Sequence, residues 1–485
     1  MITIDNRLRV CSEMVNGSGI VCDVGTDHAY LPAYLIENKI CDYALASDIN
    51  DGPLSFAEQT VKKYKFEDRI KLVKSDGLDK IPSENVSDII IAGMGGETIV
   101  SILENVQWIK NNVNLILQPM TKAGFLRRWL YENGFEIAQE KAISDDKFVY
   151  TVIRAFYSGY RIEIGKTAEH TGRVNVNTEA GRKYIENQYS QADNIVKSMC
   201  RAGKDDESQK YKYIVERLKA VLEGRMNTVS EIYNYINEAA PFSRQEKWDN
   251  SGLLTGSMEK KVNRVLVTLD ITKEVAEEAV ENGAELVVSH HPVIFHPLYT
   301  LADDEPACIL MKNGISAICC HTPYDIAKNG MNDYLMQLSG FEKVSGILEV
   351  TGNDSEPFGF GTVGVSDTEY TAAELGKKLK ELLECRVVRY TDGGKVIRKA
   401  AFCTGSGGNL IENAVKLGAD AYITSEVKHD QWIYAKRMGI SVFDCGHFHT
   451  ENAGMKYLCK RLAADFPNID ILMSEVNKDP VNYVI

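Results

Sequence analysis

Most of the histidines are clustered in a few short segments of the sequence. Six of the nine histidines lie in three short segments, and each segment directly follows a run of β-favouring residues. The segments are Ser289-His-His-Pro292 with His296, His321-Thr-Pro-Tyr-Asp325 and Gly446-His-Phe-His-Thr-Glu451. Imidazoles and carboxylates that converge from separate strand ends are the usual construction of a hydrolytic metal site. Adjacent His290 and His291 should point in different directions, which favours two metals that share a carboxylate. Three unrelated loops with surface histidines are the alternative.

A second chemical pattern is the segment Val21-Cys-Asp-Val-Gly-Thr-Asp-His-Ala-Tyr30, in which a small polar loop with Asp27 directly follows the first predicted strand and precedes a helix. Nucleoside-bearing cofactors bind at this place in a parallel sheet, because backbone N–H groups are free and Gly25 permits close approach. The dinucleotide fingerprint G-x-G-x-x-G is absent, and carboxylates suit a cationic cofactor such as S-adenosylmethionine. A plain turn with solvated carboxylates is the alternative.

Three further strand ends extend this second pattern. Asp48 ends the second predicted strand and is positioned to accept hydrogen bonds from ribose hydroxyls. Asp76, after the third strand, is placed to meet an adenine amino group, and Gly93, after the fourth, leaves room for a flat base beside the methyl donor. The sequence therefore predicts a methyltransferase whose cofactor-binding residues are Asp23, Gly25, Asp48, Asp76 and Gly93.

The first half resembles the bacterial tRNA (adenine-22-N1)-methyltransferases of the TrmK type. The motifs that carry the resemblance are Asp23-Val-Gly-Thr-Asp-His-Ala-Tyr-Leu-Pro32, Ser47-Asp-Ile, Asp51-Gly-Pro53, Asp76-Gly-Leu78, Ile91-Ala-Gly-Met-Gly-Gly96 and Leu117-Gln-Pro119. The resemblance covers about residues 1–223. It implies a Rossmann-like sheet, S-adenosylmethionine as cofactor, tRNA as partner and a helical hairpin that holds the tRNA body.

The chemistry of adenine then limits what the chain must supply. N1 carries a lone pair at neutral pH, so methyl transfer needs alignment more than a strong base. Because N1 lies on the Watson–Crick edge, the base must be unpaired or extruded. The product ring is positively charged, and a nearby carboxylate would stabilise it. Asp27 matches the family position for this role, so the resemblance implies Asp27 as the catalytic residue.

The second half resembles the NIF-three-like family of dinuclear-metal proteins, also called GTP cyclohydrolase type-two homologues. The matching segments are Pro241-Phe-Ser243, Trp248-Asp-Asn-Ser-Gly-Leu253, Ser289-His-His-Pro292, His321-Thr-Pro-Tyr-Asp325, Gly405-Ser-Gly-Gly408, Gly418-Ala-Asp420 and Gly446-His-Phe-His-Thr-Glu451. The resemblance implies a metal site in a homo-oligomer, typically a hexameric ring, and leaves the substrate undefined.

We therefore expect two divalent metals in the second half. The expected ligands are His290, His291, Asp325, His447 and Glu451, with His321 as a further candidate. One or both carboxylates should bridge the metals, and His296, His429 and His449 should lie outside the ligand set. With nitrogen and oxygen ligands and no thiolate, zinc, manganese, iron, cobalt and magnesium all remain candidates.

These residues need an α/β framework with mainly parallel sheets. The predicted strands are Ile20–Val24, Tyr43–Asp48, Ile70–Lys74, Asp88–Ala92, Leu115–Leu117, Val149–Phe156, Arg264–Leu269, Leu286–Ser289, Ser316–Cys320, Ala400–Cys403, Ala421–Thr424 and Ser441–Asp444. Two of the helices between them are expected at Pro53–Tyr64 and Ala123–Asn133. Three domains follow: a Rossmann-like methyltransferase at 1–158, a helical hairpin at 159–223 and a second α/β metal domain at 226–485.

The expected hairpin consists of two helices with an apolar seam. The seam residues are Tyr184, Tyr189, Val196, Met199, Tyr213, Leu218 and Leu222, and the expected turn is Gly203-Lys-Asp-Asp-Glu-Ser208. Sustained heptads are absent, so we expect a packed appendage rather than a free coiled coil.

Composition limits the compartment and the partners. The net charge of -13 argues against a general polyanion binder. Residues 1–223 carry 29 basic against 32 acidic side chains, whereas the remainder carries 26 against 36, so a nucleic-acid contact belongs in the first half. Eleven scattered cysteines without a Cys-x-x-Cys pair, and no visible secretory signal or membrane span, predict a cytoplasmic protein with reduced thiols.

Three functional interpretations remain open from the sequence. The first is a bifunctional fusion of a tRNA methyltransferase and a metal-dependent hydrolase-like domain. In the second, the metal domain is a non-catalytic oligomerisation or regulatory module. The third is a small-molecule methyltransferase, which a dispensable hairpin would favour. The expected ligand set contains histidine, aspartate and glutamate but no cysteine, which favours an open, catalytic metal site over a closed structural one.

Overall fold

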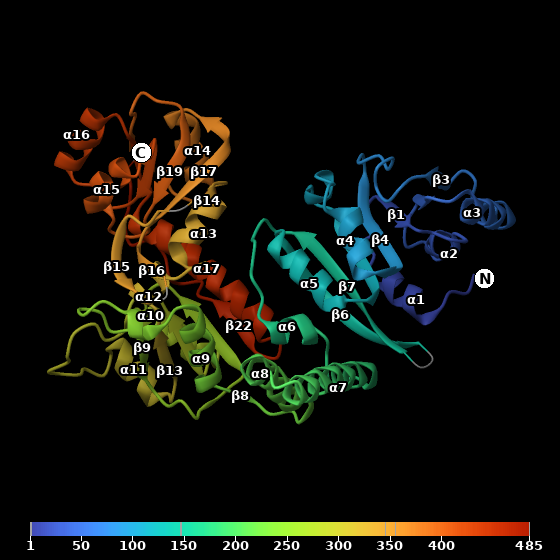
Figure 1. Ribbon diagram of the computed structural model, residues 1–485, viewed down its shortest axis with the longest axis horizontal. Coiled ribbons are helices and arrows are strands. Elements are labelled where there is room, and N and C mark those ends of the chain that lie inside the picture. Colours follow the sequence, from blue (N-terminus) through green and yellow to red (C-terminus); the bar gives the residue numbers. More distant parts are fainter. Residues whose placement is uncertain (1, 146–147, 345, 355, 485) are drawn as a thin grey trace. The chain divides into compact units, whose positions relative to one another are not determined.

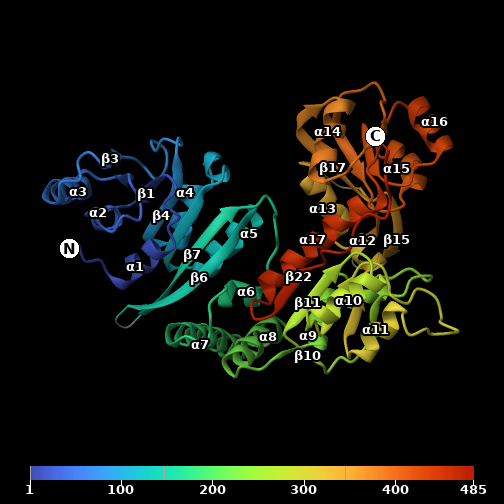
Figure 2. The ribbon, with the colours of Figure 1, turned by 180° about the vertical axis from the view of Figure 1, so that it is seen from behind.

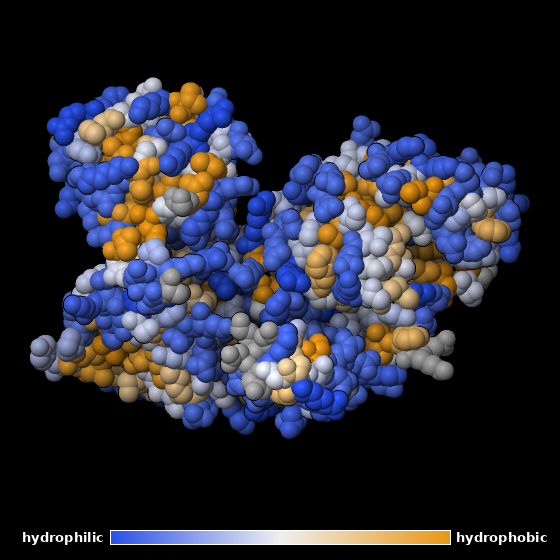
Figure 3. Space-filling view, in the orientation of Figure 1, coloured by the Kyte–Doolittle hydropathy of each residue, from blue (hydrophilic) through white to orange (hydrophobic). Residues whose placement is uncertain are grey.

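The computed structural model describes residues 2–145, 148–344, 346–354 and 356–484. The chain divides into two compact units, one of residues 1–225 with 464–467 and one of residues 226–463 with 468–485 (Figure 1). On the face shown in Figure 3, hydrophilic residues cover most of each unit, and hydrophobic residues form separate small patches. Over the described ranges, no helix has the length and apolar character that crossing a membrane requires.

The first unit is built on a seven-stranded sheet in the order β3-β2-β1-β4-β5-β7-β6. Its strands are β1 (Ile20–Val24), β2 (Ala44–Asp48), β3 (Ile70–Lys74), β4 (Val86–Gly95), β5 (Asn114–Thr121), β6 (Phe135–Asp145) and β7 (Phe148–Tyr157). The first five strands pair in parallel, and β7 pairs antiparallel with both β5 and β6. The carboxyl ends of β1, β2, β3 and β4 therefore meet at one edge of the sheet.

Helices cover this sheet because its central strands are apolar on both faces. The helices of the first unit are α1 (Asn6–Glu13), α2 (Tyr30–Glu37), α3 (Asp51–Tyr64), α4 (Gly96–Leu103), α5 (Ala123–Glu132), α6 (Lys166–Thr171), α7 (Glu179–Arg201) and α8 (Asp205–Leu222). Val21 of β1, Leu35 of α2 and Val61 of α3 belong to one buried cluster, which fixes the first half of the sheet beneath its helices.

The hairpin is formed by α7 and α8, but two of its predicted details are wrong. Leu218 is buried and Tyr189 packs against the same cluster, as expected, whereas Tyr213 is 52% exposed. The predicted turn Gly203–Ser208 is too long, because α8 already begins at Asp205. The helix therefore includes most of the residues that were assigned to the loop.

The second unit contains two main sheets. The first has the order β22-β11-β12-β13-β9, and β22 lies beside β11 (Figure 2). The second has the order β14-β17-β19-β20-β21-β18. The strands of the two sheets are β9 (Gly252–Thr255), β11 (Arg264–Thr268), β12 (Leu286–Ser289), β13 (Ser316–Cys319), β14 (Glu342–Val344), β17 (Thr362–Tyr370), β18 (Arg389–Thr391), β19 (Ile397–Phe402), β20 (Ala421–Thr424), β21 (Ser441–Asp444) and β22 (Asp470–Met473).

The smaller elements of the second unit connect and cover these sheets. They are β8 (Asn227–Thr228), β10 (Lys261–Val262), β15 (Glu349–Asn353), β16 (Pro357–Phe360), α9 (Val229–Ala239), α10 (Lys273–Glu281), α11 (Pro306–Lys312), α12 (Thr322–Ile326), α13 (Met331–Leu338), α14 (Ala372–Leu382), α15 (Ile411–Lys416), α16 (His429–Met438) and α17 (His447–Asp465). The buried strands β11, β12, β13, β20 and β21 pair in parallel within their sheets, so their carboxyl ends can present loops to a common site.

The predicted mixed α/β fold with parallel-strand sheets is confirmed. The strands predicted at Ile20–Val24, Ile70–Lys74, Leu286–Ser289, Ala421–Thr424 and Ser441–Asp444 have the observed bounds. Strands β6 and β17 were not predicted. Both interleave charged residues with apolar ones and pair antiparallel with a neighbour, so they lack the continuous apolar run of a central parallel strand.

Candidate metal centre and methyl-donor site

The predicted metal ligands converge in the second unit. Three groups of side chains each offer ligand atoms that lie within 4.8 Å of one another: His290 with His291 and His321, His291 with His447 and Glu451, and His290 with Asp325 and Glu451. All five predicted ligands are therefore brought together, and His321 joins them. Within these groups Glu451 is the carboxylate that occurs twice.

Glu451 lies between the imidazoles. Its Oε2 atom is 3.1 Å from Nε2 of His291 and 3.0 Å from Nε2 of His447, and its Oε1 atom is 3.7 Å from Nε2 of His290. Asp325 Oδ1 is also 3.7 Å from His290 Nε2. The two oxygens of one carboxylate thus face two different sets of nitrogen atoms, which is the geometry that a bridging ligand requires.

Strand ends and one helix place these groups. His290 and His291 directly follow β12, and His321 follows β13 at the start of α12, the helix that carries Asp325. His447 and Glu451 lie four residues apart in the first turns of α17, which follows β21. Residues at this spacing share one face of a helix, so both side chains point into the same site.

Each imidazole is held through its other ring nitrogen. Nδ1 of His290 is 3.0 Å from the carbonyl oxygen of Cys320. Carboxylates hold the other three: Asp270 lies 2.7 Å from Nδ1 of His291, Asp249 lies 2.8 Å from Nδ1 of His321, and Glu426 lies 2.8 Å from Nδ1 of His447. Such outer partners fix the orientation of a ligating imidazole and leave Nε2 free for a metal.

Sequence reasoning missed these three carboxylates. Asp270 and Glu426 each lie two residues beyond the end of a parallel strand, β11 and β20, and Asp249 belongs to the Trp248-Asp-Asn-Ser251 segment that the family resemblance already included. A search for acidic residues just beyond each predicted strand would have found Asp270 and Glu426.

Carboxylates and burial shift the pKa values of three imidazoles of the site in different directions. Burial alone would lower the pKa of His291, but hydrogen bonds and charge from Asp270 and Glu451 raise it to about 10. Burial likewise opposes protonation of His447, and Glu451 with Glu426 raises its pKa to about 9. His290 is fully buried, and desolvation lowers its pKa to about 4, whereas the carboxylates around His291 and His447 stabilise positive charge there, whether a proton or a metal ion carries it.

The donor set fits divalent metal ions. Among the described residues, one buried ligand nitrogen that faces the site, Nε2 of His290, has no hydrogen-bond partner, and carboxylate oxygens of Asp325 and Glu451 lie 3.7 Å from it. Buried polar groups are rarely left unpaired, because each unmade hydrogen bond costs about 1–3 kcal/mol. A metal ion would satisfy this nitrogen, and the nitrogen and oxygen donors of the site match borderline divalent ions.

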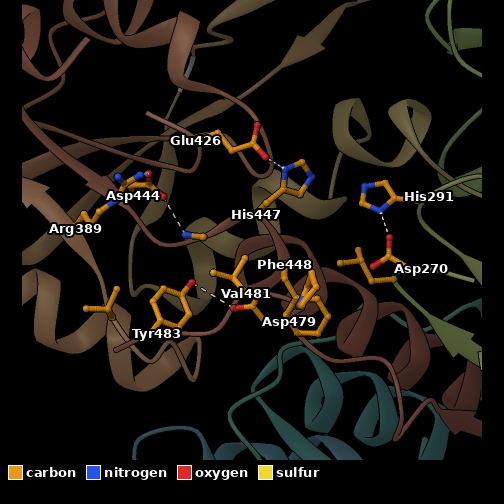
Figure 4. Close-up of a pocket in the computed structure, with 14 residues that line it drawn as sticks. Asp270, His291, Arg389, Glu426, Asp444, His447, Phe448, Asp479, Val481 and Tyr483 are labelled. Carbon is orange, nitrogen blue, oxygen red and sulfur yellow. Dashed lines mark hydrogen bonds and ion pairs between the residues drawn. The ribbon is translucent and has the colours of Figure 1, made fainter. Parts of the chain in front are cut away.

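A cavity of about 600 Å³ adjoins the candidate metal centre, and Figure 4 shows the residues that line it. Its lining includes the candidate ligands His291 and His447 and their partners Asp270 and Glu426. The rest of the lining is Leu269, Val387, Arg389, Asp444, Gly446, Phe448, Asp479, Pro480, Val481 and Tyr483. This volume lies in the usual range for small-molecule sites. The cavity therefore gives a small molecule access to the face of the centre that bears His291 and His447.

The three histidines expected outside the ligand set belong to none of the three metal-ligand groups among the described residues. His449 is 3.2 Å from Oδ2 of Asp479 through Nε2 and 3.2 Å from the carbonyl oxygen of Leu383 through Nδ1. His296 is exposed beside Phe295, and His429 is the exposed first residue of α16.

In the first unit, the predicted methyl-donor loop leaves the end of β1. Asp23 is buried and accepts a 2.6 Å hydrogen bond from the Thr26 hydroxyl, and burial raises its pKa to about 6. Gly25 has φ +74°, and an added Cβ would lie 2.2 Å from the Met94 methyl group. A side chain there would both strain the loop and displace Met94, which explains the glycine.

The other predicted cofactor residues lie at neighbouring strand ends. Asp48 is the half-buried last residue of β2 and accepts a 2.9 Å hydrogen bond from the Asn50 backbone, and Asp76 is exposed just beyond β3. Gly93 has φ +78°, and nothing lies within 4 Å of a Cβ added there, so open space faces it. Carboxylates around an open glycine position fit a cationic nucleoside cofactor.

Asp27 lies in the same loop but is not buried. Its backbone is left-handed at φ 52°, and its carboxylate is 71% exposed, 3.7 Å from Nε2 of His28. The side chain therefore remains accessible to a substrate that approaches this edge of the sheet.

Comparison with known proteins assigns both halves. The family model for Duf34/NIF3 (NGG1p interacting factor 3) matches residues 227–480, and a model for a methyltransferase domain matches residues 4–153. The two domain types expected from the motifs are therefore confirmed. A methyltransferase domain implies S-adenosylmethionine as methyl donor, and the histidine and carboxylate groups of the second unit are compatible with metal binding.

Individual relatives and a solved structure each match one part of the chain. The chain is 35% identical to a GTP cyclohydrolase 1 type 2 homolog of Clostridium perfringens over 265 residues, which are 53% of this chain and 99% of the relative. It is 32% identical to the protein NIF3 homolog of Schizosaccharomyces pombe, over 49% of this chain and 91% of the relative. The solved structure of the Bacillus subtilis M1A22 tRNA methyltransferase TrmK is 28% identical, with a TM-score of 0.41, and covers 46% of this chain and all of that one.

Proposed function

Because the chain belongs to the Duf34/NIF3 family and also contains a methyltransferase domain, we propose that it is bifunctional. The first domain transfers a methyl group from S-adenosylmethionine to adenine N1 in tRNA, at position 22. The second domain holds two divalent metals and acts on a small molecule. The methyltransferase assignment is supported by the TrmK-type motifs at the strand ends. The metal assignment is supported by the position of Glu451 between the imidazoles.

The methyl donor would bind across the carboxyl ends of β1 to β4. Asp48 would accept hydrogen bonds from the ribose hydroxyls, and the carboxylate of Asp23 would supply negative charge that suits a cationic cofactor. Gly25 and Gly93 would leave space for the cofactor and the acceptor base. Asp27 would face the extruded adenine and stabilise the positive charge that the ring gains, which requires the exposure that its side chain has.

The acceptor assignment predicts a single modified base. Incubation of bacterial tRNA with the protein and S-adenosylmethionine should give a primer-extension stop at adenine 22, because N1 methylation blocks Watson–Crick pairing. A tRNA with guanine at position 22 is the matched control and should give no stop. A stop elsewhere, or no stop with several bacterial tRNAs, would contradict the assignment.

The ribose contact predicts a loss of cofactor affinity. Changing Asp48 to Ala should weaken binding of S-adenosylmethionine by about 1–3 kcal/mol, because two ribose hydroxyls would lose their acceptor. Calorimetry measures this directly. Asp42→Ala is the control, because Asp42 is an exposed acid just before the opposite end of β2. Equal affinity of the Asp48 variant and the wild type would remove Asp48 from the site.

In the metal domain, one ion would be held by His291, His447 and Glu451, and the other by His290, Asp325 and Glu451, with His321 available beside them. Bound divalent ions supply Lewis acidity and lower the pKa of coordinated water, as metal-dependent hydrolases require. The protein orients the imidazoles through Asp249, Asp270 and Glu426.

The adjoining cavity supports a catalytic centre rather than a closed structural one. A structural site surrounds its metal completely, whereas His291 and His447 line a cavity of about 600 Å³. A metal-loaded protein should therefore be screened for hydrolysis of nucleotides and phosphoesters. Turnover that chelation abolishes would support catalysis, and no turnover with a fully loaded centre would favour the oligomerisation or regulatory role.

The proposal includes three properties carried over from the sequence: the domain bounds 1–158, 159–223 and 226–485, a cytoplasmic location, and a homo-oligomer built on the metal domain. Light scattering of the purified chain tests the last of these, and a monomer at micromolar concentration would contradict it.

A further inference from the structure

The segment Ser474–Tyr483, which follows β22, packs against the metal centre without regular secondary structure. We propose that Asn477 in this segment is a positioning residue, which fixes the orientation of His291 by holding Asp270. The inference rests on the proposed metal site. It adds that one of the two ions depends on a segment that carries no metal ligand.

Asn477 binds the loop that follows β11 through both ends of its side-chain amide. Its Oδ1 atom accepts hydrogen bonds from the backbone N–H of Leu269, at 3.2 Å, and of Asp270, at 3.5 Å. Its Nδ2 atom donates to Oδ2 of Asp270 at 3.5 Å. One amide therefore contacts both the backbone and the carboxylate of Asp270, so it restricts the position of this side chain.

Asp270 transmits this restraint to His291. Its other oxygen, Oδ1, accepts from Nδ1 of His291 at 2.7 Å, which assigns the proton to Nδ1 and leaves the Nε2 lone pair for a metal. Nε2 in turn lies 3.1 Å from Oε2 of Glu451. Asp270 is only half-buried, so without Asn477 its carboxylate can rotate toward the cavity and release the imidazole.

The segment itself is anchored independently of the metal. Ser474 donates its backbone N–H to the carbonyl oxygen of Val267 in β11 at 2.8 Å, and the Ser474 hydroxyl accepts from the Asn477 backbone at 3.2 Å. Farther on, Oδ2 of Asp479 lies 3.2 Å from Nε2 of His449. These contacts hold Asn477 in place before any ion binds.

The other imidazoles do not depend on this segment. Asp249, which holds His321, accepts from the backbone N–H of Thr322 at 3.1 Å and from the Ser251 hydroxyl at 2.9 Å. His290 is held by a backbone carbonyl and His447 by Glu426. Loss of Asn477 should therefore weaken the ion at His291, His447 and Glu451 and spare the ion at His290 and Asp325.

The test compares cobalt binding by full-length variants. Metal-free protein is titrated with Co²⁺ while visible absorption and elemental analysis report the two ions. Asn477→Ala should bind one ion as the wild type does and the other about 10–100-fold more weakly, the usual cost of losing an outer partner of a ligand. Asn482→Ala is the matched control, because Asn482 is an exposed asparagine of the same segment, and it should bind both ions normally.

A second variant distinguishes positioning from a general loss of structure. Asp270→Asn should weaken binding of the same ion. Adding Asn477→Ala to this variant should cause little further loss of affinity, because both changes act on His291 through Asp270. Two normal affinities in Asn477→Ala, equal weakening of both ions, or additive losses in the double variant would each overturn the inference. A wild type that binds no cobalt would instead overturn the proposed metal site.

Discussion

Changing Glu451 to Gln is expected to remove both metal ions together. The side chain keeps its size, but it loses the negative charge that lies 3.1 Å and 3.0 Å from the imidazoles of His291 and His447 and 3.7 Å from that of His290. Two dications so close together repel each other, and a shared carboxylate offsets this repulsion. The loss of affinity should exceed the roughly 10–100-fold that removal of an outer partner costs.

Elemental analysis after dialysis against each candidate metal measures this effect. Glu412→Gln is the control, because Glu412 is an exposed acid of α15 that pairs with Lys416 on the same helix. It should retain the metal content of the wild type. If Glu451→Gln still carried two ions per chain, the bridging role would be lost, and a wild type without metal under every reconstitution would refute the site.

Changing Arg127 to Met is expected to destabilise the first unit by about 3–5 kcal/mol, because it leaves a buried charge without its partner. Arg127 and Glu140 are almost completely buried and lie 2.6 Å apart. The guanidinium also donates to the Tyr184 hydroxyl at 2.8 Å and to the Glu169 carbonyl oxygen at 2.5 Å. This one side chain therefore connects α5, β6, α6 and α7, and its loss should loosen the hairpin first.

Hydrogen exchange of the amides in β6 and α7 measures the loss region by region. Arg128→Met is the matched control: its side chain is 38% exposed and lies 3.6 Å from Glu169, and exposed pairs contribute about 0–1 kcal/mol. The double change Arg127→Met with Glu140→Gln should recover part of the loss, because it removes the unpaired charge. Equal exchange in both single variants would contradict the role of the network.

Some of the fold was inaccessible to sequence reasoning because its cause is not local. Strand β6 alternates apolar and charged residues, and it forms by pairing with β7 along its whole length. Tyr213 has the spacing of an apolar seam but is 52% exposed, because α8 presents Ile214 and Leu218 to α7 instead. Helical periodicity predicts that a face is buried, and only the packing partner decides which face.

The sequence alone determined which strand ends carry the chemistry. Short apolar strands that contain Asp23 or end just before His290 and His321, and the four-residue spacing of His447 and Glu451, are local patterns that fix local geometry. The tertiary structure decided the rest. Asp249 and Asn477 reach their partners His321 and Asp270 across 72 and 207 residues, and Glu451 lies between imidazoles from two different sheets. Such contacts depend on strand order and on how two sheets meet, which no local pattern specifies.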